Sequence, residues 1–389
     1  MDDNVGTTEK GIVSAKVMTP RARVLAILQG GRPDKVPWFG DLDYWATALI
    51  ARGEKPGDFK TSAAYIRWHE DLGIGFYLQG YFPFRTIYGS GEKIWHEGRR
   101  RWREFATPHG MLRDCWEYLP ASCSEGPIEH LLKSEADLAA LRHVYERITY
   151  EPDYQFALRR RSEIGDQGIL LCYLPKSPFM QLVALEGGIE AVTFAEAAAP
   201  AEFAETLAVM KSAFDRAARI AVESPAEALM IPENLSSEMV GPRFFEAYVR
   251  PYQEEWIRKI AAAGKSSFIH MDGTLRGLIA REASTGVNVI EAMTPAPVGD
   301  IGVGEWAAAA GNPRTILWGG IPGSYFTPAV DDAEFDRHVR EALAAMRTAP
   351  RYVLGVADQV PPDGLESRVR RVRELVEESG AYGLLPPVQ

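Results

Sequence analysis

The chain has 389 residues, of which 46% are hydrophobic and 25% are charged, so it can bury a large core and has no compositional sign of disorder. Its 43 Lys and Arg residues against 53 Asp and Glu residues give a formal net charge of -10, which repels phosphate backbones and anionic lipid. We therefore expect a globular protein that binds neither nucleic acid nor membranes.

The amino-terminal residues are polar and lack the apolar core and the cleavage site of a signal peptide. No apolar run in the chain approaches the roughly twenty residues that a membrane span needs. The three cysteines, Cys115, Cys123 and Cys172, form neither an even disulfide framework nor a close pair of the zinc-binding kind. These patterns predict a cytoplasmic protein with a flexible tail over residues 1–18 and a single domain over residues 19–389.

Short apolar runs alternate along the chain with amphipathic helical segments, which is the pattern of βα units around a parallel sheet. Apolar residues three or four apart predict helices over 200–221, 242–263 and 332–347. Because no Gly-x-Gly-x-x-Gly follows the first strand, about eight strands favour an α/β fold of the (β/α)8 barrel type over a dinucleotide-binding fold. The expected strands are 36–39, 74–78, 168–174, 228–231, 265–269, 287–290, 315–318 and 352–356.

One segment, residues 81–119, interrupts this alternation. It is dense in aromatic residues, glycine and alternating charge, which predicts antiparallel hairpins. We expect these hairpins to cover one mouth of the barrel, either as a surface feature or as a functional lid. The basic run RRRWR at 99–103 is expected to be a solvated hairpin face, and the alternative is a clamp for an acidic substrate or partner.

Polar or ionisable side chains follow several expected strands at the point where each strand ends. In a barrel the carboxyl ends of all strands converge on one face. A single polar residue after a strand is more often a helix cap, and a lone histidine is more often structural. Together, however, five such side chains predict a functional site. The five are Glu233, His270, Asp272, Glu291 and Asp358.

Further segments carry a resemblance to a known family. They are TPRARVL at 19–25, PDKVP at 33–37, TPHG at 107–110, LKSEADL at 132–138, FFEAYVRPY at 244–252 and VPP at 360–362, together with the strand that holds His270 and Gly273. In these segments the chain resembles the uroporphyrinogen decarboxylase-like superfamily, over nearly its whole length after residue 18. The superfamily includes the decarboxylase and the methyltransferases that act on corrinoid proteins and coenzyme M. The resemblance implies a (β/α)8 barrel.

The methyltransferase branch of this superfamily holds zinc through a His-x-Cys pair and a distant cysteine. This chain matches the histidine with His270, but Asp272 and Asp358 stand where the cysteines would be. Carboxylates keep the charge of thiolates and are harder ligands. The resemblance thus implies a divalent metal, zinc first and manganese or iron as alternatives, on His270, Asp272 and Asp358. It further implies Glu233 or Glu291 as a completing ligand or general base, and a corrinoid supplied by a separate protein.

The decarboxylase branch has an Arg-Gln-Ala-Gly-Arg run that binds substrate carboxylates, and this chain lacks it. Here Pro37-Trp38 is followed by FGDLD at 39–43, so no arginine is placed to hold a polycarboxylate. Asp41 or Asp43 would contact a substrate or cap the following helix. The residues expected to bind the substrate are Trp38, Asp41, Asn234 and Gly320.

The expected function is therefore methyl transfer between a small methylated compound, or a methyl-corrinoid, and an acceptor. Catalysis would rest on Glu233, Glu291 and His270. One alternative is a metal-free carboxy-lyase acting on a uroporphyrinogen-like or small acid, with His270 as proton donor and Asp272 as its electrostatic partner. The other alternative is a barrel that binds a ligand without catalysis.

Overall fold

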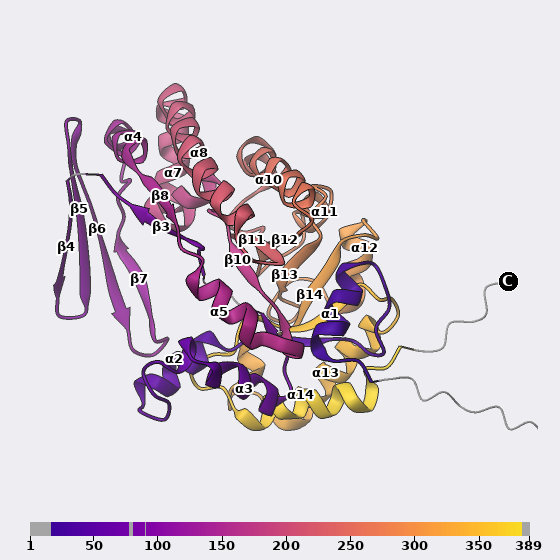
Figure 1. The fold of residues 1–389 in the computed structure, drawn as a ribbon. Helices are drawn as coiled ribbons and strands as arrows, with labels where there is room; N and C mark the ends of the chain where they lie inside the picture. Colours follow the sequence, from indigo (N-terminus) through magenta and orange to yellow (C-terminus); the bar gives the residue numbers. More distant parts are fainter. Residues whose placement is uncertain (1–16, 78–80, 90, 383–389) are drawn as a thin grey trace, which may run out of the picture.

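The computed structural model describes residues 17–77, 81–89 and 91–382, so most of the expected tail over 1–18 lies outside the described residues. A curled sheet of parallel strands forms the centre, in the order β1-β15-β14-β13-β12-β11-β10 (Figure 1). Its strands are β1 (Trp38–Asp41), β10 (Leu171–Tyr173), β11 (Ala228–Leu235), β12 (Ser266–Met271), β13 (Val289–Met293), β14 (Ile316–Pro322) and β15 (Tyr352–Gln359).

A short strand, β2 (Phe76–Tyr77), completes the ring between β1 and β10. It pairs in parallel with β9 (Gly168–Ile169), which runs directly into β10. A parallel bridge between Phe39 and Gly75 joins β2 to the other side of the ring. Gly75 is required there, because a Cβ atom would lie 2.5 Å from the Phe39 ring. The predicted α/β class and parallel barrel are confirmed.

Several strands run further than their apolar runs predicted. β11 ends at Leu235, β12 at Met271 and β13 at Met293, so Glu233, His270 and Glu291 lie inside strands. Apolar runs define a strand only up to its first polar side chain. The backbone ladder continues past that point, because backbone pairing does not depend on side-chain polarity.

Aromatic rings fill the interior of the barrel. Phe39, Tyr77 and Phe268 each pack against Trp318, with ring centroids 5.3, 5.0 and 5.6 Å apart. Helix α1 (Pro20–Leu28) adds Val24 and Ile27 to the same apolar cluster. The barrel is therefore packed solid below its carboxyl end, and only that end is left for polar side chains.

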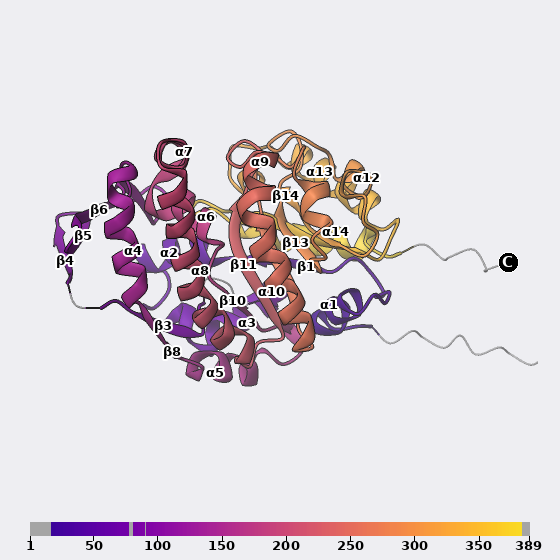
Figure 2. The same cartoon turned by 90° about the horizontal axis from the view of Figure 1, so that it is seen from above.

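Helices surround the sheet, and Figure 2 shows α8 and α10 lying side by side along β10 and β11. The helices predicted over 200–221, 242–263 and 332–347 are confirmed, the second with a π-helical turn at Phe245–Val249. None of the described helices is long and apolar enough to cross a membrane. The longer helices are α2 (Asp43–Ala51), α3 (Ala63–Leu72), α4 (Leu138–Arg147), α5 (Gln155–Ile164), α7 (Gly188–Ala198), α8 (Pro200–Glu223), α10 (Arg250–Ala262), α13 (Asp332–Met346) and α14 (Glu366–Ser379). The shorter ones are α6 (Pro178–Gln181), α9 (Pro242–Phe244), α11 (Ile279–Ala283) and α12 (Trp306–Ala310).

The inserted segment forms antiparallel sheets, as predicted. β3 (Phe84–Ile87) pairs with β8 (Thr149–Pro152), and a separate sheet has the order β4 (Glu92–Glu97), β5 (Arg100–Thr107), β6 (Gly110–Leu119) and β7 (Ser124–Glu129). Phe105 and Leu112 are buried where this sheet meets the rest of the protein. The basic run lies on and next to β5, where Arg100, Arg101 and Arg103 form ion pairs with Glu117, Glu125 and Asp114 of the same sheet. A hairpin face with paired charges accounts for that run.

Candidate functional site

The centre of the site is His270 on β12, which lies beside Glu291 on β13. These two residues are direct partners in the parallel register, so their side chains project from the same side of the sheet. His270 Nδ1 lies 2.8 Å from Glu291 Oε2, and the Tyr77 hydroxyl donates to Glu291 Oε1 at 2.9 Å. Both carboxylate oxygens of the fully buried Glu291 are thus engaged, which fixes the histidine ring in place.

The other ring nitrogen of His270 faces Asp358 at the end of β15. His270 Nε2 lies 3.8 Å from Asp358 Oδ1. Burial opposes the imidazolium form, but the Glu291 carboxylate outweighs it, with Asp272 and Asp358 adding to the effect, and raises the pKa of His270 to about 9. Burial also raises the pKa of Asp358, and the nearby His270 limits that rise. His270 is therefore protonated at neutral pH.

A cavity of about 270 Å³ opens next to this cluster. Asp41, at the end of β1, lines it and is only 6% exposed. Burial raises the pKa of Asp41 well above its usual range, and the neighbouring carboxylate of Asp43 adds to the shift. Asp41 Oδ1 also accepts from the Asp43 backbone at 2.8 Å, so this side chain both supports the start of α2 and faces the cavity. The cavity is lined by Gly40, Asp41, Asp43, Lys60, Thr61, Tyr65, His69, Phe76, Tyr77, Tyr81, Phe156, Tyr173 and Gln359.

Basic groups are few around this cavity. Lys60 Nζ donates to Asp43 Oδ2 at 2.7 Å and to Thr47 Oγ1 at 2.9 Å, so its charge is already paired. Burial lowers the pKa of His69 to about 4, and its Nδ1 lies 2.8 Å from the Tyr65 carbonyl oxygen, so that ring is neutral. No arginine is among the described residues that line the cavity. The cavity is consequently acidic and aromatic.

Glu233, predicted to join this cluster, lies elsewhere. It is fully buried, and its Oε2 accepts from the backbone and the hydroxyl of Ser177 at 3.0 and 3.1 Å. Burial raises the pKa of Glu233 to about 7, and Lys176 and Ser177 limit the rise. The pairing of β11 with β12 shifts register between Ile231 and Leu235, around Glu233. Because β11 gains two residues there, Glu233 stays on the face of Ile231 and Leu235, opposite to that of His270, and contacts the segment before α6.

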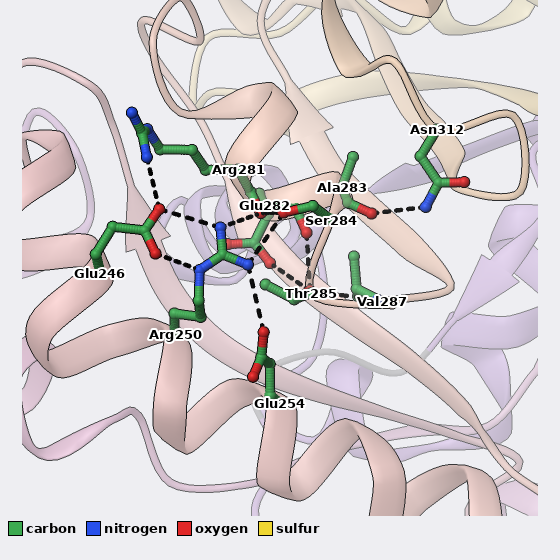
Figure 3. A network of polar contacts seen from close by, with 10 residues as sticks. All are labelled: Glu246, Arg250, Glu254, Arg281, Glu282, Ala283, Ser284, Thr285, Val287 and Asn312. Carbon is green, nitrogen blue, oxygen red and sulfur yellow. Dashed lines mark hydrogen bonds and ion pairs between the residues drawn. The ribbon is translucent and has the colours of Figure 1, made fainter.

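A polar network on the outer side of the sheet includes Glu282 of α11. Burial raises the pKa of Glu282 to about 8, the Glu233 carboxylate adds to the shift, and Gln253 donates to Glu282. Next to it, Arg250 bonds Glu246 Oε2 at 2.5 Å and Ser284 Oγ at 3.0 Å (Figure 3). These contacts tie α10 to α11. The pKa shifts of Glu233 and Glu282 thus follow from burial in a structural network.

Three other predicted residues have structural contacts. Trp38 stacks on Phe326 with centroids 6.3 Å apart and is not among the residues that line the cavity. Gly320, also outside the lining, has φ 113° and accepts from His338. Asn234 has φ 56°, and its Oδ1 accepts from Lys176 at 3.0 Å. Of the four residues predicted to bind the substrate, only Asp41 lines the cavity.

The predicted metal ligands are brought together only in part. The 3.8 Å between His270 Nε2 and Asp358 Oδ1 is close to the separation of two ligands of one ion, and Nδ1 has the carboxylate partner typical of a metal-bound histidine. Among the described residues, however, no group of three or more His, Cys, Asp or Glu side chains is arranged to hold a metal ion. His270 Nε2 and Asp358 Oδ1 are two donor atoms, whereas a catalytic zinc site has three protein ligands.

Sequence reasoning missed Tyr77. It ends the second strand and lies 214 positions before Glu291, to which it donates. A signal was available, since Tyr77 follows the same strand-end pattern as the other site residues. No sequence pattern indicated that Lys60 lines the cavity, because it lies on a 3-10 turn, Phe59–Thr61, between two helices.

Comparisons with known proteins agree with this architecture. The family model described as uroporphyrinogen decarboxylase (URO-D) matches residues 166–379, which is more than half of the chain. The match begins just before β9 and ends with α14. The chain belongs to the uroporphyrinogen decarboxylase family. The resemblance seen in the sequence is thereby confirmed. A search of curated proteins gives no match.

One solved structure shares the fold of this family member, and a second is more distant. A methyltransferase from Methanosarcina mazei matches 93% of this chain and 99% of its own, with a TM-score of 0.59 and 14% sequence identity. A D-psicose 3-epimerase crystallised with D-fructose matches 61% of this chain and 86% of its own at 12% identity. Its TM-score is 0.37. The first match shows a common barrel architecture.

Proposed function

We propose that this uroporphyrinogen decarboxylase family member is an enzyme that moves a methyl group between a small methylated compound, or a methyl-corrinoid protein, and an acceptor. The observation that carries the proposal is the acidic, aromatic cavity at the carboxyl end of the barrel, next to the protonated His270. The methyltransferase from Methanosarcina mazei has the same fold, which is compatible with this chemistry.

The charges around the cavity argue against a polycarboxylate substrate. Carboxylates are held most efficiently by arginine, which forms two parallel hydrogen bonds. Here Asp41 and Asp43 line the cavity, and Lys60 is the only lysine or arginine among the described lining residues. Because Lys60 is paired with Asp43, the described lining offers no unpaired lysine or arginine to hold the several carboxylates of a porphyrinogen. A neutral small molecule suits this lining better.

His270 would act as the general acid of the reaction. When the methyl group leaves, the bond between its carbon and the substrate heteroatom breaks, and the bonding electrons stay on the heteroatom. The acceptor nucleophile forms the new bond to carbon, while the Nε2 proton of His270 moves to the heteroatom. Glu291 holds the imidazolium through Nδ1, and Tyr77 holds Glu291.

The corrinoid and the metal are separate parts of the proposal. A corrinoid would be supplied by another protein and would serve as methyl donor or acceptor. A divalent metal, held by His270, Asp272 and Asp358, would be an alternative to the Nε2 proton, because His270 would have to lose that proton to bind it. The metal would then supply the polarisation of the reacting heteroatom. Elemental analysis of the purified protein tests the metal. The expected result is one stoichiometric ion that is lost in Asp272→Ala. If wild type contains no stoichiometric ion, the metal is excluded from the proposal.

A methyl-transfer assay tests the main proposal. Free cob(I)alamin is supplied as acceptor with a panel of small methylated compounds, and formation of methylcobalamin is followed by absorbance. Loss of the general acid in His270→Gln should lower kcat by about 10² or more. His109→Gln changes an exposed histidine in a turn of the inserted sheet and should leave kcat unchanged. Equal kcat in wild type and His270→Gln would contradict the assignment.

Decarboxylation of a small acid is the second candidate, favoured by the proton that His270 holds next to the cavity. That proton would quench the carbanion left when carbon dioxide departs. Release of carbon dioxide without methyl transfer would replace the first proposal with this one. If replacing His270 and Glu291 together leaves turnover unchanged, neither candidate holds, because both use these residues. A wild type that binds its ligand but shows no turnover in either assay would indicate a barrel without catalysis.

A further inference from the structure

The inserted sheet ends in a strand, β4, whose outer edge pairs with no other strand among the described residues. β4 is the terminal strand of the order β4-β5-β6-β7, and it lies on the outside of the molecule in both views (Figures 1 and 2). Ile94, in its middle, is 51% exposed. An edge strand presents unpaired N–H and C=O groups, to which another strand can add.

The register of the sheet sets which side chains share its outward face. Lys93 lies opposite Glu104, which lies opposite Arg113. At the other end of β4, Glu97 lies opposite Arg100, which lies opposite Glu117. Each row alternates in charge from strand to strand. The charges that face outward at the edge are therefore positive at Lys93 and negative at Glu97.

Between these two rows lies an aromatic row. Trp95 is opposite Trp102, and their rings stack with centroids 6.0 Å apart and planes 8° apart. Lys93 Nζ lies 5.0 Å from the Trp95 ring centroid. The edge thus presents the sequence Lys, Trp, Glu on one face.

This sequence is self-complementary in one antiparallel register. A two-fold axis perpendicular to the sheet, with Trp95 opposite the second copy's Trp95, places Lys93 opposite the second copy's Glu97, and the reverse. The charges then alternate in sign from strand to strand across the interface between the two copies, and the stack of tryptophan rings continues across the same interface. Moving the axis to Ile94 would instead place Lys93 opposite Trp95 and leave Glu97 without a partner. The joined row is Arg113, Glu104 and Lys93, followed by the second copy's Glu97, Arg100 and Glu117.

We propose that two copies of this chain associate through β4 to form one continuous antiparallel sheet, with Trp95 at the two-fold axis. A charged residue on an edge strand usually prevents pairing. Lys93 would prevent pairing with most other strands. It favours pairing with a second copy of β4, because cross-strand pairs of opposite charge stabilise a sheet and like charges destabilise it. The two Lys93–Glu97 pairs specify the partner and the register together.

The test uses two single-charge variants of the full chain, Lys93→Glu and Glu97→Lys. Each variant alone would place like charges opposite each other twice in its own dimer, so its dissociation constant should rise at least about tenfold. In an equimolar mixture, the heterodimer regains two opposite-charge pairs. The internal neighbours Glu104 and Arg100 are the same before and after association, so their effect cancels in this comparison.

Sedimentation velocity over concentrations up to on the order of 100 µM measures association, since a small interface gives weak dimers. The expected result is a dimer for wild type, monomers for each variant alone, and a dimer for the mixture. Glu135→Lys, which makes the same charge change at an exposed residue off the sheet, should dimerise like wild type. Circular dichroism melts confirm that the variants are folded. A monomeric wild type, single variants that dimerise like wild type, or a mixture that stays monomeric would each overturn the proposal.

Discussion

Replacing Glu291 by glutamine should discharge His270 at neutral pH. In the native protein the Glu291 carboxylate 2.8 Å away outweighs burial and raises the pKa of His270 from 6.5 to about 9. The glutamine side chain would keep the size of the native one and lose its charge. Burial, the largest single influence on this ring, would then lower the pKa of His270 below 6.5.

The same shift sets a pH dependence of stability. A rise in pKa from 6.5 to about 9 corresponds to about 3 kcal/mol. Between these two pH values the folded protein keeps a proton that the unfolded chain has lost, so the free energy of unfolding contributed by His270 falls as the pH rises from 6.5 to 9. In Glu291→Gln this fall should disappear.

Nuclear magnetic resonance of ring-labelled histidine measures the pKa directly. The chain has seven histidines, and the spectrum of His270→Gln identifies the signal. Tyr77→Phe is the matched control, because it removes a hydrogen bond to Glu291 and leaves the charge in place, so His270 should still titrate above 6.5. If His270 in Glu291→Gln stays protonated at pH 7.5, the carboxylate is not the cause of the shift and the account of the site is wrong.

Three further changes test other parts of the fold. Asp358 has φ 64°, so Asp358→Ala should unfold in urea with about 1 kcal/mol less stability than Asp358→Asn, and equal stabilities would argue against backbone strain. Arg160 is fully buried and donates to the Lys60 and Ser62 carbonyls, so Arg160→Met should lose about 3 kcal/mol in denaturant titration; a loss within error would disprove this role. Burial raises the pKa of Glu282 from 4.5 to about 8, so wild-type stability should fall across that range, and Glu282→Gln should flatten the fall; an unchanged slope would contradict it.

The sequence by itself determined the fold class. The spacing of apolar runs and helical segments is a local property, and it recurs at each strand of the barrel. The sequence also placed His270 and Glu291 at the ends of neighbouring strands. Because parallel strands align their carboxyl ends, that order along the chain was enough to predict that these two side chains meet.

The tertiary structure alone decided which strand-end residues share a side of the sheet. Glu233 follows its strand just as His270 does, but it contacts Ser177 and lies in the network with Glu282. Successive side chains of a strand alternate between faces, and Ile231 and Leu235 pair with Ile269 and Met271. Glu233 therefore lies on the face of Ile269 and Met271, whereas His270 lies on the other face, and this pairing of the two strands cannot be read from either apolar run alone.

Charge and partners at the site also depend on the folded arrangement. Tyr77 reaches Glu291 only because the ring closes through β2, and the cavity that holds Asp41 forms only where α2, α3 and the strand ends pack together. A residue's titration depends on burial and on neighbours distant in the chain. The sequence therefore supplied the acidic and basic groups, and the tertiary structure decided that His270 holds a proton between Glu291 and Asp358.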